Sequence, residues 1–290
     1  MLSIFNVLIA VSPFDLEILF PLSEKIHAWC IQRIYQNNPD QIEIYLALLC
    51  GKRLPSGEIR DIFTQVGLVH LMVVSGAHLI FLEKMWLKLP HWPFKNIFIS
   101  LSLVLYTLMA GLHPPVFRAL ISFFLHRFVK RFQLFWSSYW IIMLSGVLSL
   151  IFNPKWVSSI SLQLSLLGAI GFVSSRYSKL FSCILCYMLL LPVLSQWTSL
   201  HPLTAGVNWI FYPLISITLF PLSVLSFIFP FCYHITSYFW LKLIQFLKLL
   251  QPFLEQIPFY IYPISGYWVW FYIALVFFIS QGALVCLRKN

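Results

Sequence analysis

The stretch from residue 65 to residue 89, QVGLVHLMVVSGAHLIFLEKMWLKL, constrains the fold more than any other part of this chain. It is apolar and long enough to cross a bilayer as a helix, yet His70, Ser75, Gly76 and His78 lie in its middle. At helical spacing, His78 projects within about 80° of His70 and about 60° of Ser75. Polar groups in hydrocarbon need partners and are typical of functional sites. The sequence therefore predicts a helix that bends or breaks near Ser75-Gly76 and turns both histidines toward other helices.

Further apolar stretches of similar length follow this one. The chain has 290 residues, of which 60% are hydrophobic and only 10% charged, a composition typical of multi-pass membrane proteins rather than soluble domains. The predicted fold class is therefore all-α, a polytopic helical membrane protein with about eight membrane-spanning segments. The predicted spans are residues 66–87, 95–112, 115–130, 136–152, 158–175, 180–198, 203–229 and 264–286.

Two kinds of segment depart from simple spans. Residues 203–229 contain Pro213 and Pro221, so they form either one kinked helix or two half-helices that re-enter the membrane. Residues 13–38 and 234–255 are amphipathic, and both are expected to lie in the membrane interface. The expected division is an apolar start with an interfacial helix over residues 1–41 and a transmembrane channel domain over residues 42–290.

The distribution of charge narrows the function. Residues 1–61 contain seven carboxylates and five Lys or Arg, whereas residues 62–290 contain fourteen Lys or Arg and only Glu83 and Glu255. This scarcity of acids argues against a cation channel, carboxylate acid–base catalysis and a Mg²⁺ or Ca²⁺ site. We expect no catalytic residue, no metal and no cofactor. Basic residues cluster at 84–95, 127–131 and 176–179, and the positive-inside rule places all three clusters in the cytoplasm.

The six cysteines are expected to be unpaired. Four of them are scattered singly, and Cys183 and Cys186 lie in an apolar stretch without a nearby charge. A buried structural role is typical of cysteines in such surroundings.

Arg118 is the strongest candidate for a functional side chain. It follows Pro114-Pro115, which opens a helix, and Ser122, His126 and Lys130 continue from it at intervals of four residues. An arginine in the first turns of a helix meets the positive end of the macrodipole, so it needs an anion or carbonyl groups elsewhere. We expect it to contact a phosphate. The alternative is that it reaches the outer interface or caps the carbonyls of a neighbouring helix.

Three more polar residues lie beside predicted breaks. His113 precedes the double proline, Gln163 follows the turn at Asn153-Pro154, and Asn208 lies one turn before Pro213. Gln163 suits either an interhelical hydrogen bond or a pore lining. A polar amide beside a broken helix, like Asn208, is how transporters often build sites. The same two alternatives, a hydrogen bond within the bundle or contact with the transported molecule, apply to the two histidines near Ser75.

Four motifs occur in a fixed order. They are GLVHLMVVSGAH at 67–78, YTLMAGLHPPVFRA at 106–119, NP at 153–154 leading into SLQLSLLGAIG at 161–171, and NWIFYPL at 208–214. Together they resemble the ComEC family, the inner-membrane DNA-uptake channel of natural competence, over residues 42 to 286. The resemblance implies a channel that passes single-stranded DNA into the cytoplasm. It also implies a periplasmic DNA receptor and a cytosolic DNA translocase as partners, and it leaves the oligomeric state open.

The chain also departs from the family pattern. Ala77 stands where Leu is common, Pro115 where Ser is usual, and Ser161-Leu162 where Gly-Phe is usual. Full-length members add an OB-like domain and often a nuclease-like domain, for which this chain has no room. We therefore expect a minimal channel unit that leaves strand degradation to a separate nuclease.

Two alternative functions belong to other classes. Ser75 with His78, or His70 with His78 and His113, could form a nucleophile–base pair or a zinc site of a membrane-embedded enzyme. No core carboxylate is available to orient a histidine, so we expect a protein that is not an enzyme. The second alternative is a small-anion transporter.

Overall fold

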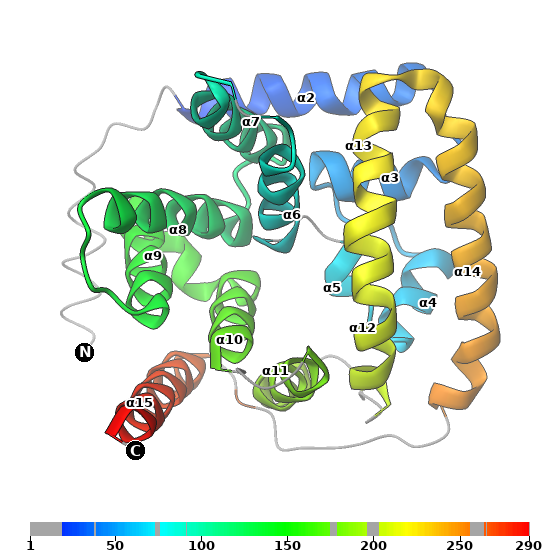
Figure 1. The fold of residues 1–290 in the computed structure, drawn as a ribbon. Coiled ribbons are helices and arrows are strands. Elements are labelled where there is room, and N and C mark those ends of the chain that lie inside the picture. Colours follow the sequence, from blue (N-terminus) through cyan, green and yellow to red (C-terminus); the bar gives the residue numbers. More distant parts are fainter. Residues whose placement is uncertain are drawn as a thin grey trace. The chain divides into compact units, whose positions relative to one another are not determined.

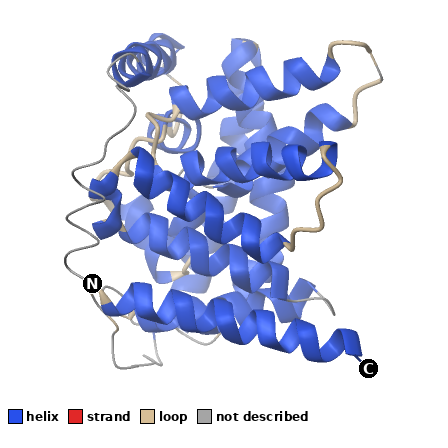
Figure 2. Ribbon diagram, turned by 90° about the vertical axis from the view of Figure 1, so that its left-hand side faces the viewer, coloured by secondary structure: helices blue, strands red, loops and turns tan. Residues whose placement is uncertain are grey.

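The computed structural model describes residues 19–37, 39–72, 76–90, 92–174, 179–195, 203–255, 264 and 266–289. Throughout these residues the chain forms helices joined by short turns, without a strand (Figure 2). The prediction of an all-α fold is therefore confirmed. The apolar start that we expected within residues 1–41 lies outside the described residues up to residue 18.

The helices fall into two compact units, which we describe separately. Unit 1 comprises residues 1–15, 117–200 and 259–290, and unit 2 comprises residues 16–116 and 201–258. The helices of unit 2 are α2 (Leu19–Asn37), α3 (Ile42–Cys50), α4 (Glu58–Gln65), α5 (Val69–Met72), α6 (Gly76–Leu87), α7 (Lys95–Met109), α12 (Thr204–Pro213), η3 (Leu214–Leu219), α13 (Phe220–Ile228), η4 (Pro230–Cys232) and α14 (Tyr233–Glu255). Unit 1 contains most of α8 (Pro114–Arg131), α9 (Ser138–Phe152), η2 (Pro154–Ser158), α10 (Ile160–Ser174), α11 (Lys179–Leu194) and α15 (Trp268–Lys289).

Among the described residues, one helix is long and apolar enough to cross a membrane, the continuous run Thr204–Ile228. The other apolar helical stretches among these residues are shorter, at 10–17 residues. Turns shorten several expected spans: Gly111 and Leu112 adopt positive φ angles after α7, and Asn153-Pro154 starts η2. At 1.5 Å per residue, the 15 residues of α7 extend about 22 Å. The expectation of about eight crossings therefore stays a prediction.

The run Thr204–Ile228 contains both Pro213 and Pro221, for which we expected either one kinked helix or two half-helices. It is a single helix, and its middle turn, η3, widens to a π-helix directly after Pro213. Proline lacks the N–H that an α-helix requires, and local widening of the helix is one way to accommodate the missing hydrogen bond. The half-helix alternative is thus excluded for this segment.

The amphipathic segment 234–255 packs against other helices of unit 2. It forms most of α14, which runs beside α12 and α13 in the opposite direction (Figure 1). Trp240 is fully buried and its Nε1 donates a hydrogen bond to Ser223 of α13 at 3.1 Å, while Ser226 and Thr236 share a hydrogen bond of 2.7 Å. One face of α14 is therefore covered by α13, and the expected position of this segment in the membrane interface stays a prediction.

The expectation of unpaired cysteines is wrong for Cys30 and Cys50. They form a disulfide between α2 and α3, and both side chains are fully buried. The two residues are 20 positions apart, but α2 ends at Asn37 and α3 turns back against it. Spacing along the sequence does not reveal such a reversal.

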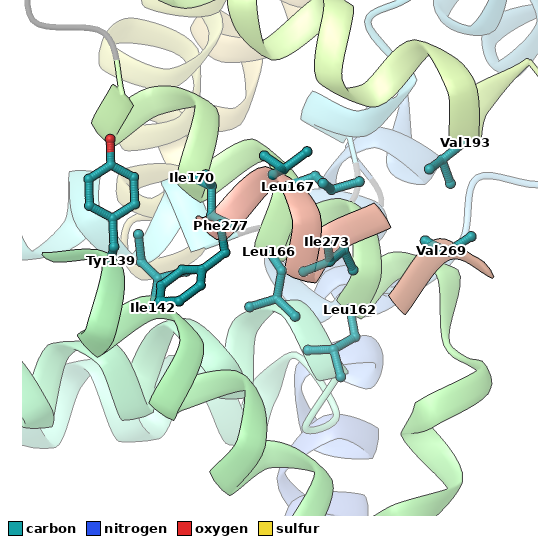
Figure 3. Packing of buried hydrophobic residues seen from close by; sticks show 11 residues of the cluster. Tyr139, Ile142, Leu162, Leu166, Leu167, Ile170, Val193, Val269, Ile273 and Phe277 are labelled. Carbon is teal, nitrogen blue, oxygen red and sulfur yellow. The ribbon is translucent and has the colours of Figure 1, made fainter. Parts of the chain in front are cut away.

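The core of unit 1 is made by α9, α10, α11 and α15. Leu162, Leu166 and Ile170 lie on one face of α10 and point toward the neighbouring helices (Figure 3). The buried cluster comprises Tyr139, Ile142, Leu162, Leu166, Leu167, Ile170, Val193, Val269, Ile273, Val276 and Phe277. This packing holds α10 against α9, so residues on adjacent faces of these two helices meet α8.

Candidate functional site

Arg118 lies in the interior of unit 1. The double proline Pro114-Pro115 begins α8, and Arg118 lies four residues after the start of this helix. Arg118 is only 6% exposed. Its Nε donates a hydrogen bond to the hydroxyl of Ser165 on α10 at 3.0 Å, and its Nη1 donates to Ser122 on α8 at 3.3 Å. Ser122 in turn donates to Ser145 on α9 at 2.8 Å, and Ser145 donates to a carbonyl of its own helix. Three helices therefore converge on one guanidinium through neutral hydroxyl groups.

Among the residues that the structure describes, no carboxylate pairs with the positive charge of Arg118. Residues 117–200 and 259–290 contain nine Lys or Arg and neither Asp nor Glu. Hydroxyl groups satisfy two of the five N–H donors of the guanidinium but do not neutralise it. A buried cation without a counter-ion is costly, so this arrangement suits an anion that enters from outside the chain.

The polar stripe expected along α8 divides into two parts. Arg118 and Ser122 face the interior of unit 1, whereas His126 and Lys130 are exposed. Each step of four residues turns about 40° around a helix, which carries the second half of the stripe out of the interior. Arg127 lies over the ring of Phe123 at 5.1 Å.

The segment that begins at residue 65 contributes α5 (Val69–Met72) and α6 (Gly76–Leu87). The break expected beside Gly76 falls on residues 73–75, which lie outside the described residues, as does the side chain of His70. His78 is fully buried in unit 2, and its ring stacks on Phe220 with centroids 4.5 Å apart. Tyr106 meets the same phenylalanine edge-on at 5.8 Å. Stacking on Phe220, which Tyr106 contacts in turn, holds the imidazole of His78 within unit 2.

His113 lies in the turn between α7 and α8 and also belongs to unit 2. Its Nε2 donates a hydrogen bond to the carbonyl of Gly51 at 2.8 Å. Burial lowers the pKa of His113 below its usual value, which favours the neutral ring in this place. The histidine therefore joins the end of α3 to the end of α7.

Gln163 and Asn208 each hold a local backbone turn. Gln163 Nε2 donates to the carbonyl of Val157 in η2 at 3.1 Å. Asn208 Nδ2 donates to the carbonyls of Thr204 at 2.9 Å and Gly67 at 3.4 Å. Asn208 Oδ1 and Thr204 Oγ1 are buried without a hydrogen-bond partner among the described residues. Gln163 thus contacts the segment just before its own helix, whereas Asn208 links α12 to the turn before α5.

Replacing Gly67 by alanine is expected to destabilise unit 2. Gly67 has a φ of +76°, and a Cβ added there would lie 2.1 Å from Thr204 Cγ2. Strain and overpacking together typically cost about 1–3 kcal/mol, and the melting temperature of the detergent-purified protein should fall. Gly206→Ala is the matched control, because Gly206 lies in the same helix as Thr204 and has nothing within 4 Å of its Cβ position. Equal melting temperatures for the two variants would contradict the prediction.

The site residues predicted from the sequence are divided between the two units. Arg118, Ser122, His126 and Gln163 belong to unit 1, whereas Gly76, His78, His113 and Asn208 belong to unit 2. Sequence reasoning did not connect Ser145 and Ser165 with Arg118, because the spacing of Ser165 on its helix indicates a small-residue packing seam and nothing in the spacing of Ser145 singles it out. Among the described residues, no group of three or more His, Cys, Asp or Glu could hold a metal ion.

Comparisons with known proteins identify a family that matches most of the chain. The family model described as Competence protein matches residues 48–289. Over 203 residues the chain is 27% identical to the Uncharacterized protein YcaI of Escherichia coli (strain K12), an alignment that covers 64% of this chain and 26% of YcaI. The chain thus matches about a quarter of the length of that relative. No solved structure matches the chain.

Proposed function

Because the chain belongs to the Competence protein family, we propose that it is a multi-pass protein of the bacterial inner membrane that passes single-stranded DNA into the cytoplasm. In this proposal a periplasmic receptor delivers the DNA and a separate nuclease degrades the other strand. The chain has no nucleotide-binding loop of the GxxxxGK[ST] type, so a cytosolic translocase supplies the energy.

The buried guanidinium of Arg118 is the observation that carries the proposal. Ser122 and Ser165 hold it through two of its five N–H groups, and residues 117–200 and 259–290 offer no carboxylate to pair with it. A phosphodiester group offers two oxygens that can accept parallel hydrogen bonds from the planar guanidinium. Acids along the path would repel a polyanion, and residues 117–200 and 259–290 contain none.

The test is a gene deletion in a transformable strain without another member of the family. Labelled double-stranded DNA is supplied, and the label that reaches a nuclease-protected cytosolic pool is measured. We expect uptake to fall to background while DNA still binds to the cell surface, and a plasmid copy should restore it. Normal uptake in the deletion strain would refute the channel function.

A small-anion transporter is the competing function that the same site supports, since one guanidinium and two hydroxyls also suit a single small anion. The two functions separate in liposomes that contain the purified protein. Flux of chloride or inorganic phosphate in the absence of DNA, unaffected by added single-stranded oligonucleotide, would favour the small-anion function.

A further inference from the structure

Three aromatic rings from three elements of unit 1 meet beside the N-terminal end of α8. Phe117 of α8 lies 4.1 Å from Phe152 at the end of α9, and 5.4 Å from Trp156 in η2. Phe152 and Trp156 are stacked at 5.8 Å with an angle of 29° between their planes. All three side chains are partly exposed. We call these residues, Phe117, Phe152 and Trp156, the aromatic triad.

The short helix that carries Trp156 is held by several hydrogen bonds. Asn153 Oδ1 accepts one from the backbone N–H of Lys155 at 3.1 Å. The carbonyl of Val157 accepts two more, from Gln163 Nε2 at 3.1 Å and from Trp270 Nε1 at 2.8 Å. These hydrogen bonds fix the backbone of Lys155 and Val157, the residues on either side of Trp156. The triad is therefore a prearranged surface, and Gln163 is one of the residues that position it.

Two residues of the triad have a cationic residue next to them in the sequence. Lys155 precedes Trp156 and is exposed, while Arg118 follows Phe117 and is buried. Proteins that bind single-stranded nucleic acid without sequence preference combine cations that follow the phosphates with aromatic rings on which the bases stack. In the acid-free segments of unit 1 this combination has no carboxylate competing for Lys155.

We propose that the aromatic triad binds the bases of single-stranded DNA by stacking, while Lys155 binds an adjacent phosphate. The inference rests on the proposed function and extends it, because it gives unit 1 a site for the bases in addition to the phosphate contact of Arg118. The ligand class is a single strand of any sequence, since every base offers a flat face to stack on. A paired duplex hides those faces, so the triad distinguishes single strands from double strands.

The competing reading is that the triad is part of an aromatic belt at the membrane interface. An oligonucleotide that carries the phosphates without the bases separates the two. We would measure binding of a fluorescent single strand and of an abasic strand of equal length to the full chain in nanodiscs. The variants are Trp156→Leu, Trp156→Phe and Trp140→Leu, the last a control on α9, where the indole is 56% exposed and packs on Phe277 instead of the triad.

We expect Trp156→Leu to weaken binding of the base-bearing strand by about five- to a hundredfold and to leave binding of the abasic strand unchanged. Trp156→Phe should bind within about threefold of the wild type, because it keeps a stacking face. Lys155→Gln should weaken both strands and lower the salt dependence by about one counterion. Trp140→Leu should change neither.

Four results would overturn the inference. They are an abasic strand that binds the wild type as tightly as the normal strand, an equal loss of both strands in Trp156→Leu, a loss in Trp156→Phe as large as in Trp156→Leu, and a matching loss in Trp140→Leu. The first of these would leave the proposed DNA channel intact and remove only the stacking site. A wild-type protein that binds neither strand would instead refute the proposed function itself, and the inference with it.

Discussion

Replacing Arg118 by lysine is expected to lower DNA uptake by about ten- to a hundredfold, because hydrogen bonds that involve a charged group are worth about 1.5–3 kcal/mol. Lysine keeps the positive charge but loses the planar set of N–H donors that bonds Ser122 and Ser165 and, in the proposed function, a phosphate as well. The measurement is labelled DNA in the nuclease-protected cytosolic pool, at equal membrane abundance of the two proteins. Arg127→Lys is the matched control on α8, where the guanidinium lies over Phe123 at the partly exposed end of the helix.

A second substitution separates a functional arginine from a structural one. Arg118→Met removes a buried charge that has no carboxylate partner among the described residues, and such replacements are often neutral or stabilising. We expect uptake to be lost while the melting temperature stays the same or rises. If Arg118 serves only to cap hydroxyls and carbonyls, the methionine variant should melt earlier and the lysine variant should transport normally.

The local features of the fold were predictable because they depend on neighbouring residues. Pro114-Pro115 begins α8 where the sequence predicts the start of a helix. Gly51 ends α3 in a left-handed conformation with φ of 71°. Glycine and proline limit the backbone directly, so their consequences can be read without knowing the rest of the fold.

Features that depend on distant residues were not predictable in the same way. The amphipathic pattern of residues 234–255 predicts an apolar face but not what covers it, and the tertiary structure shows that α13 packs on it. Ser165 of α10 is 47 residues from its partner Arg118, and Ser145 of α9 is 23 residues from its partner Ser122. Hydroxyl groups carry no charge and follow no ligand spacing, so the sequence identified Arg118 and Ser122 on one helix but not their partners on the other two.

Loss of the disulfide between Cys30 and Cys50 is expected to have the largest effect on stability. It closes a loop of 20 residues, for which the expected contribution is about 3 kcal/mol. Cys30→Ser and Cys50→Ser, alone or together, should lower the melting temperature to the same extent, since either one opens the loop. Cys232→Ser is the control, because Cys232 is a free thiol and should change stability by less than about 0.5 kcal/mol. A double variant much less stable than each single variant would show that burial of the sulfur atoms matters more than the bond.

The same disulfide makes a prediction for the proposed membrane topology. Disulfides persist in oxidising compartments, and Cys50 adjoins Gly51, whose carbonyl accepts the hydrogen bond of His113 just after α7. If α7 crosses the membrane as we propose, its end is expected on the outer side. Independently, the positive-inside rule predicts that Lys95, at the start of α7, faces the cytoplasm. Two unrelated arguments thus predict the same direction for this helix.

This orientation makes a prediction that can be checked in intact cells. After denaturation of the protein, a thiol reagent should leave Cys30 and Cys50 unlabelled unless a reductant is added first, because they are paired. In cells that lack the extracytoplasmic thiol oxidase, both should remain thiols, and the protein should migrate as its reduced form on a non-reducing gel. A cysteine introduced in place of Lys95 should react only after the membrane is permeabilised. Labelling of that cysteine in sealed cells would place both ends of α7 on one side, and α7 could then not cross the membrane.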